Sequence, residues 1–156
     1  MVSKRELAKD NPKEKTAVGA VANGDYYWVG QLLEEGLYPN MDAVSNHPYI
    51  WNAGGVFNYL VDDEYHRFIS GMTGAITKYG GWKEQIITEV GWPTHSGGIT
   101  KEQQAIELVK QVVVADYYDI STNQFYRSAD DFVHDYYSAD EAENNFGVFY
   151  HVHKCG

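Results

Sequence analysis

The chain of 156 residues has a single cysteine, Cys155, close to its C-terminal end. One thiol cannot form an intrachain disulfide, and it cannot supply the several thiolates of a structural zinc site. His151 and His153 stand beside it, but three potential ligands within five residues at a chain end are more often adventitious than a metal site. We therefore expect neither a bound metal nor a cofactor.

Cations are also scarce. Lysine and arginine together number 12 against 22 acidic residues, which gives a formal net charge of −10. Nucleic acids and anionic membranes are bound through clustered cations that displace counterions. The charge balance therefore argues against both as partners.

Long apolar runs are missing as well. No stretch approaches the roughly 18 consecutive apolar residues that a membrane span needs. The first fifteen residues are charged throughout and lack the apolar core of a signal peptide. Taken alone, the chain shows no route out of the cytoplasm. A signal on a longer polypeptide would not appear in it, so the sequence leaves the localisation open.

The chain does contain the apolar material of a folded domain. Hydrophobic residues make up 44% and aromatic residues 15% of it, which excludes a disordered acidic tail. Short apolar runs alternate with segments of helical period: expected strands cover 16–21, 41–49, 85–90 and 121–127, and expected helices cover about 26–35, 68–79 and 101–117. This alternation predicts an α/β fold with parallel strands and crossover helices. A doubly wound sheet is its plainest form.

Two of the expected helices have recognisable starts. Asp25 is a suitable N-cap for the first, and Thr100 with Gln103 forms a capping box at the start of the third. The apolar stripe of this third helix, which a helical period turns toward a core, consists of Ala105, Leu108, Val109, Val112 and Val113.

The segment from Ile87 to Thr94 carries the most chemistry. It places Glu89 at the carboxyl end of an apolar strand, directly before Gly-Trp-Pro. In parallel α/β folds, sites are built at the carboxyl ends of strands. The flat apolar face of Trp92 suits the CH-rich face of a sugar ring. The plainer interpretation is a glutamate that caps the next loop and a tryptophan that belongs to the core.

The sequence from Ile87 to Ala105 resembles the seventh-strand segment of clan-A retaining glycoside hydrolases, in particular the β-xylosidase-like and cellulase-like groups. Four further segments resemble this family in the same order: Val18–Ala20 its fifth strand, Asp42–Tyr49 its sixth, Lys78–Gly81 the run into the seventh and Asn145–Gly147 the segment after the eighth. The resemblance covers nearly the whole chain.

The resemblance implies a (β/α)8 barrel, the TIM fold, of which this chain would form about strands five to eight. It implies hydrolysis of O-glycosyl bonds with retention of configuration, with Glu89 as the nucleophile. His47 and Tyr49 would hydrogen-bond the nucleophile or a sugar hydroxyl. Candidates for contact with the carbohydrate substrate are Trp51, Trp92 and Tyr126.

The chain also departs from the family pattern. The family's acid/base is a glutamate in an Asn-Glu pair on the fourth strand, and this chain has no Asn-Glu pair. Met1 falls where the fourth helix should be ending, so we expect strands one to four to be absent. The eighth-strand segment 121–126 has no tryptophan, although the family usually places one there.

Three hypotheses follow. In the first, the chain is the C-terminal half of a glycosidase and needs an N-terminal half-barrel that brings the acid/base. In the second, it is a non-catalytic half-barrel that pairs with a second copy of itself and binds sugar or serves as a scaffold. In the third, it is a small acidic α/β domain of another topology, with a structural Glu89.

Overall fold

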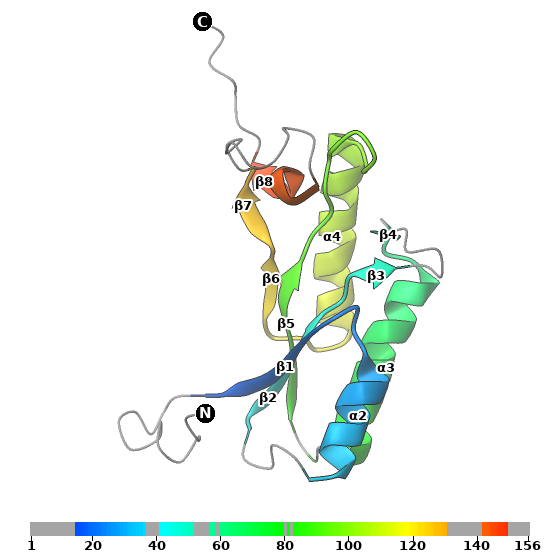
Figure 1. Ribbon diagram of the computed structural model, residues 1–156, viewed down its shortest axis with the longest axis vertical. Coiled ribbons are helices and arrows are strands. Elements are labelled where there is room, and N and C mark those ends of the chain that lie inside the picture. Colours follow the sequence, from blue (N-terminus) through cyan, green and yellow to red (C-terminus); the bar gives the residue numbers. More distant parts are fainter. Residues whose placement is uncertain are drawn as a thin grey trace, which may run out of the picture.

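Four parallel strands form the main sheet of the chain, in the order β1-β2-β5-β6 (Figure 1). They are β1 (Ala17–Ala22), β2 (Ala43–His47), β5 (Glu84–Val90) and β6 (Asn123–Phe125). This computed structural model describes residues 15–36, 41–51, 57–58, 60–79, 81, 83–130 and 142–149. The fold is α/β with parallel strands, as the alternating sequence pattern predicts.

Three helices connect these strands: α2 (Tyr26–Glu34), α3 (Asp63–Tyr79) and α4 (Lys101–Tyr117). The predicted N-caps of α2 and α4 are present: Asp25 accepts a hydrogen bond from the Trp28 amide at 2.9 Å, and Thr100 accepts one from the Gln103 amide at 3.1 Å. The strands lie in sequence order with no reversal, so right-handed crossovers place all three helices on one face. A doubly wound sheet would need a reversal, and this sheet is singly wound instead.

Short elements complete the described chain. β3 (Ile50–Trp51) pairs antiparallel with β4 (Phe57–Asn58), and β7 (Arg127–Ala129) pairs in parallel with β8 (Gly147–Phe149), which follows the 3₁₀ helix Ala142–Asn145. The strand expected over 121–127 is therefore divided at Tyr126. Residues 1–14, 52–56, 131–141 and 150–156, with the predicted features that fall on them, lie outside the described residues.

Two apolar clusters fill the space between the sheet and the helices. One joins Val29 and Leu33 of α2 to Met72 and Ile76 of α3 over Val44 of β2. The other packs α3 and α4 against β5, and its members are Val61, Tyr65, Ile69, Ile87, Val90, Trp92, Val114, Ala115 and Ile120. Within the described part of the chain, no helix is long and apolar enough to cross a membrane.

Helix α4 turns a polar face toward the interior. Gln104, Glu107 and Gln111 are at most 1% exposed. Glu107 accepts a hydrogen bond from the Val61 amide at 2.8 Å, and Gln104 donates one to the Trp92 carbonyl at 2.6 Å. These bonds offset the cost of removing polar groups from water, so the buried face of α4 is held by hydrogen bonds to neighbouring segments.

The outward face of α4 is apolar, which corrects the predicted stripe. Ala105, Val109, Val112 and Val113 of that stripe are exposed, and only Leu108 packs partly against the core. The large apolar side chains on this exposed face are Ile106, Val109, Val112, Val113 and Tyr117. A monomeric protein rarely leaves such a contiguous patch in water. The apolar period of α4 therefore marks an outer surface of the chain.

Two β-bulges interrupt the pairing of the sheet. On β1, Gly19 pairs with Ser45 and Val21 with Asn46, so Ala20 is an extra residue. On β5, Ile87 pairs with Asn123 and Val90 with Phe125, so three steps on β5 match two on β6. A bulge of this kind reverses the inward and outward alternation of the residues that follow it.

The bulge on β1 depends on Gly19. Its φ is +108°, and a Cβ there would lie 2.4 Å from the Ser45 carbonyl oxygen. We predict that Gly19→Ala lowers the free energy of unfolding by about 1–3 kcal/mol through backbone strain, and by more through the contact with Ser45. Gly74 of α3 has open space around it, so Gly74→Ala should stabilise the helix by about 1 kcal/mol or less.

Urea unfolding followed by circular dichroism measures both changes. Unchanged stability of Gly19→Ala would show that the backbone of β1 does not pass Ser45 in this way.

Candidate functional site

Glu89 lies at the carboxyl end of β5, where the bulge determines its direction. Ile87 and Val90 both belong to the core on the helix side, although they are three residues apart. The extra residue between them leaves both Thr88 and Glu89 free of that core, and the side chain of Glu89 is 31% exposed. The strand thus presents a partly exposed carboxylate without taking an apolar residue out of the interior.

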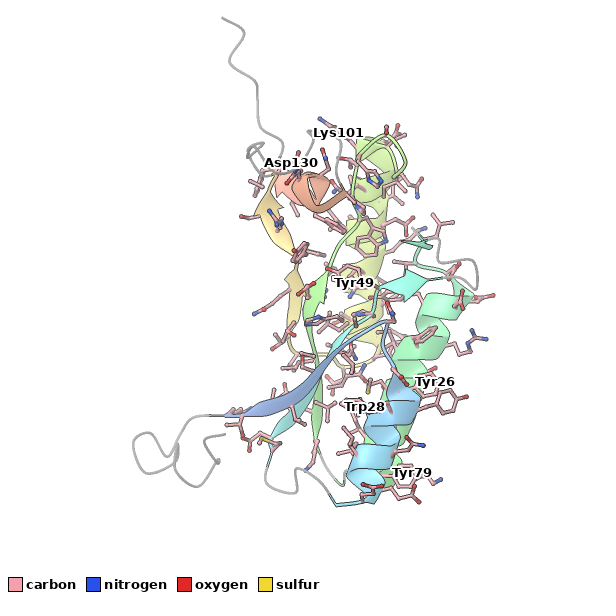
Figure 2. All side chains as sticks on the ribbon, viewed as in Figure 1. Tyr26, Trp28, Tyr49, Tyr79, Lys101 and Asp130 are labelled. Carbon is pink, nitrogen blue, oxygen red and sulfur yellow. The ribbon has the colours of Figure 1, made fainter. Side chains whose placement is uncertain are left out.

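The neighbouring strand brings two polar side chains to this carboxylate. β2 runs parallel to β5 with Asn46 beside Ile87, so the residues after Asn46 come level with the end of β5. The Tyr49 hydroxyl donates to Glu89 Oε1 at 3.0 Å, and His47 Nδ1 lies 3.6 Å from Glu89 Oε2. Figure 2 shows Tyr49 beside the carboxyl end of β5. The structure therefore brings His47 and Tyr49 to Glu89, as the sequence analysis expected.

A pair of hydroxyl groups lies on the other side of His47. Its Nε2 is 3.0 Å from Thr88 Oγ1, which is in turn 2.5 Å from Ser45 Oγ. Ser45 is 4% exposed and the imidazole of His47 is 18% exposed. Sequence reasoning did not select Ser45 or Thr88, because their link to His47 depends on the register between two strands.

An aromatic wall adjoins the carboxylate. The ring of Phe146 packs edge to face against Tyr49, with 6.2 Å between centroids, and against Tyr126, with 5.2 Å. Phe146 also covers Gly91, where a Cβ would lie 2.9 Å from its ring. The wall thus consists of Tyr49, Phe146 and Tyr126. The sequence marked Phe146 as part of a family-like segment and did not link it to the site, because its contact with Tyr49, 97 positions away, leaves no local pattern.

The predicted sugar-contacting residues have different outcomes. Tyr126 is half-buried at the end of β6, and its amide donates to the Val90 carbonyl at 2.7 Å. Trp92 is 3% exposed and belongs to the core, so it presents no face to a sugar ring here. Its backbone carbonyl is bonded by Gln104 of α4 at 2.6 Å, so the segment after β5 is held against this helix. The side chain of Trp51 lies outside the described residues.

The described contacts of Glu89 are with a phenol and an imidazole. No interaction joins it to a second carboxyl group among the residues that the structure describes. Within the same ranges, no group of three or more His, Cys, Asp or Glu side chains is arranged to hold a metal ion. The described part of the site therefore offers a carboxylate that is held by a phenol and faced by an imidazole.

The similarity of the chain to known proteins is limited. No protein-family model matches the chain, and no curated protein matches it. Among solved structures, it is similar to Lactobacillus rhamnosus beta-glucuronidase, with 24% sequence identity and a TM-score of 0.46 over 70% of this chain. The matched region covers 19% of that protein, so the chain spans about a fifth of its length.

The bond between Tyr49 and Glu89 generates a prediction for stability. Tyr49→Phe removes the donor and Glu89→Ala removes the acceptor. We expect a double-mutant cycle in urea unfolding to give a coupling energy of about 0.5–1.5 kcal/mol. Tyr117→Phe, at a residue that is 76% exposed, is the matched control and should show no coupling to Glu89→Ala. Zero coupling for the first pair would contradict the contact.

Proposed function

We propose that this chain carries the nucleophile of a retaining glycoside hydrolase and that Glu89 is that nucleophile. The observation that carries the proposal is the environment of Glu89: a partly exposed carboxylate at the carboxyl end of a parallel strand, bonded by Tyr49 and faced by His47. Sites of parallel α/β folds lie at this end of the strands. The five family-like segments of the sequence point to the same chemistry.

The geometry distinguishes the two oxygens of Glu89. Oε1 accepts the Tyr49 hydroxyl at 3.0 Å, whereas Oε2 is 3.6 Å from His47 Nδ1, which exceeds hydrogen-bond length. Oε2 therefore keeps more of its electron density and is the oxygen that we assign to attack on the anomeric carbon. The Tyr49 hydroxyl holds the carboxylate by its other oxygen, so Oε2 is left facing the open side of the site.

A retaining mechanism needs a second carboxyl group. In such enzymes, two carboxyl groups lie about 5–5.5 Å apart, and the second protonates the leaving oxygen and then activates water. The chain has no Asn-Glu pair of the kind that supplies this group in the family it resembles. We propose that a separate or upstream half-barrel contributes it. The TIM barrel, the carbohydrate substrate and the sugar contacts of Tyr126 belong to the same proposal.

The surfaces of the chain support a need for completion. β1 and β6 are the edges of the main sheet, and each pairs with a single neighbour within it. Unpaired edges of this kind invite another strand. The outward face of α4 is apolar in addition. A half-barrel that continues the sheet from both edges would pair these strands and close the structure.

Self-association is the second candidate, and the same open edges favour it. Two copies of a four-stranded unit would close an eight-stranded barrel without any other chain. Light scattering on the purified chain separates the candidates. A stable dimer of about twice 17.7 kDa supports self-association. A monomer that becomes active only with an N-terminal half-barrel supports the glycosidase half and excludes the self-paired barrel.

Catalysis by Glu89 is tested in the completed enzyme. Glu89→Gln keeps the shape of the side chain but removes its charge, so we predict that glycoside hydrolysis falls to background. Glu84→Gln is the matched control, because Glu84 stands at the amino end of the same strand, with its side chain 28% exposed. It should retain activity. Equal turnover of Glu89→Gln and the unmodified enzyme would overturn the assignment.

A further inference from the structure

Ser45, Thr88 and His47 form a chain of polar contacts that ends at Glu89. Ser45 Oγ is 2.5 Å from Thr88 Oγ1, Thr88 Oγ1 is 3.0 Å from His47 Nε2, and His47 Nδ1 faces Glu89 Oε2 at 3.6 Å. Ser45 and His47 are two residues apart and lie on the same face of β2, and Thr88 lies beside them on β5. The three side chains are held by two paired strands, so their order is fixed by the backbone.

The number of hydrogens on these groups determines the direction of the hydrogen bonds in this network. Each hydroxyl has one hydrogen to donate, and a neutral imidazole has one N–H and one acceptor nitrogen. If the N–H were on Nε2, it would donate to Thr88, and the lone pair of Nδ1 would face the carboxylate of Glu89. Like partial charges at 3.6 Å repel, and no hydrogen bond offsets that repulsion.

The opposite direction keeps both hydrogen bonds of the network and removes the repulsion at Nδ1. Ser45 then donates to Thr88, Thr88 donates to Nε2, and the N–H on Nδ1 turns its positive edge toward Glu89. The burial of Ser45, at 4% exposure, leaves its hydroxyl little water as an alternative partner. The network is therefore favourable in one arrangement when the imidazole is neutral.

We propose that Thr88, oriented by Ser45, is a positioning residue that holds neutral His47 in the tautomer with its hydrogen on Nδ1. A free histidine side chain favours the hydrogen on Nε2, so the protein selects the less common tautomer. The consequence for catalysis rests on the proposed function: Glu89 would meet an N–H on its Oε2 side and the Tyr49 hydroxyl on its Oε1 side. The tautomer itself does not depend on any activity.

The test is the ring nitrogen spectrum of His47 in the unmodified chain. Long-range ¹H–¹⁵N correlation at alkaline pH, where the imidazole is neutral, distinguishes a protonated from an unprotonated ring nitrogen. His47→Gln identifies its signals among those of the six histidines. We expect Nδ1 to carry the hydrogen in most molecules. A majority with the hydrogen on Nε2 would overturn the proposal, whether or not any variant folds.

Three variants then locate the cause. Thr88→Val keeps the β-branched shape and removes the hydroxyl that donates to Nε2, so we expect the fraction of molecules with the hydrogen on Nε2 to rise measurably, while Thr88→Ser restores the original ratio. Thr73→Val removes a hydroxyl that bonds Gln85 at 2.7 Å, and this control should leave His47 unchanged. An unchanged tautomer in folded Thr88→Val would overturn the role of Thr88.

The outcomes of this test and of the Glu89→Gln test are independent. If the unmodified chain carries the hydrogen on Nε2, the proposed role of Thr88 and Ser45 is wrong, but Glu89 can still be a nucleophile. If Glu89→Gln keeps full activity, Glu89 is not the nucleophile, but the tautomer of His47 in the unmodified chain is not decided by that result.

Discussion

The candidate site depends on the bulge in β5. A regular strand turns alternate residues to opposite faces, so Glu89 would lie on the same face as Ile87 and Val90 would lie on the opposite one. One extra residue between Ile87 and Val90 keeps both in the apolar core and frees Thr88 and Glu89. The carboxylate then meets Tyr49, and the Thr88 hydroxyl meets His47. Core packing and site geometry are thus consequences of the same irregularity.

The rest of the described chain is consistent with a structure that needs a neighbour. Its interior holds two apolar clusters, yet α4 buries Gln104, Glu107 and Gln111 and exposes valines. The polar groups are satisfied by bonds within the chain, whereas the apolar ones are not covered by any described residue. This distribution and the two sheet edges are the observations behind our proposal that a further half-barrel completes the chain.

Local features of the fold were predictable from the sequence. The caps at Asp25 and Thr100 act over three residues, and the strand and helix periods need no knowledge of distant contacts. The face of α4 was not predictable in this way, because Glu107 finds its partner, the Val61 amide, 46 positions away. Polar side chains with such partners are buried in preference to valines, against the usual rule for a helix.

The residues of the site also divide into those that local sequence predicts and those that depend on distant contacts. The motif around Glu89 and the parallel pairing of two expected strands placed His47 and Tyr49 near the carboxylate. Trp92 follows Glu89 closely in sequence, but its side chain lies in the core, and no residue pattern reveals that direction. Phe146 and the Ser45–Thr88 contact depend on pairing between distant segments, so only the three-dimensional structure reveals them.

The central claim is that Glu89 forms a covalent bond to a sugar, and intact-mass analysis with a trapping substrate tests it most directly. A panel of 2,4-dinitrophenyl 2-deoxy-2-fluoroglycosides suits the chain in complex with a half-barrel that completes it. The dinitrophenolate leaves without an acid, and the fluorine slows release of the glycosyl enzyme. We predict a gain of one fluoroglycosyl group, located on Glu89 by peptide sequencing and absent from Glu89→Gln. Labelling of another residue, or equal labelling of Glu89→Gln, would contradict it.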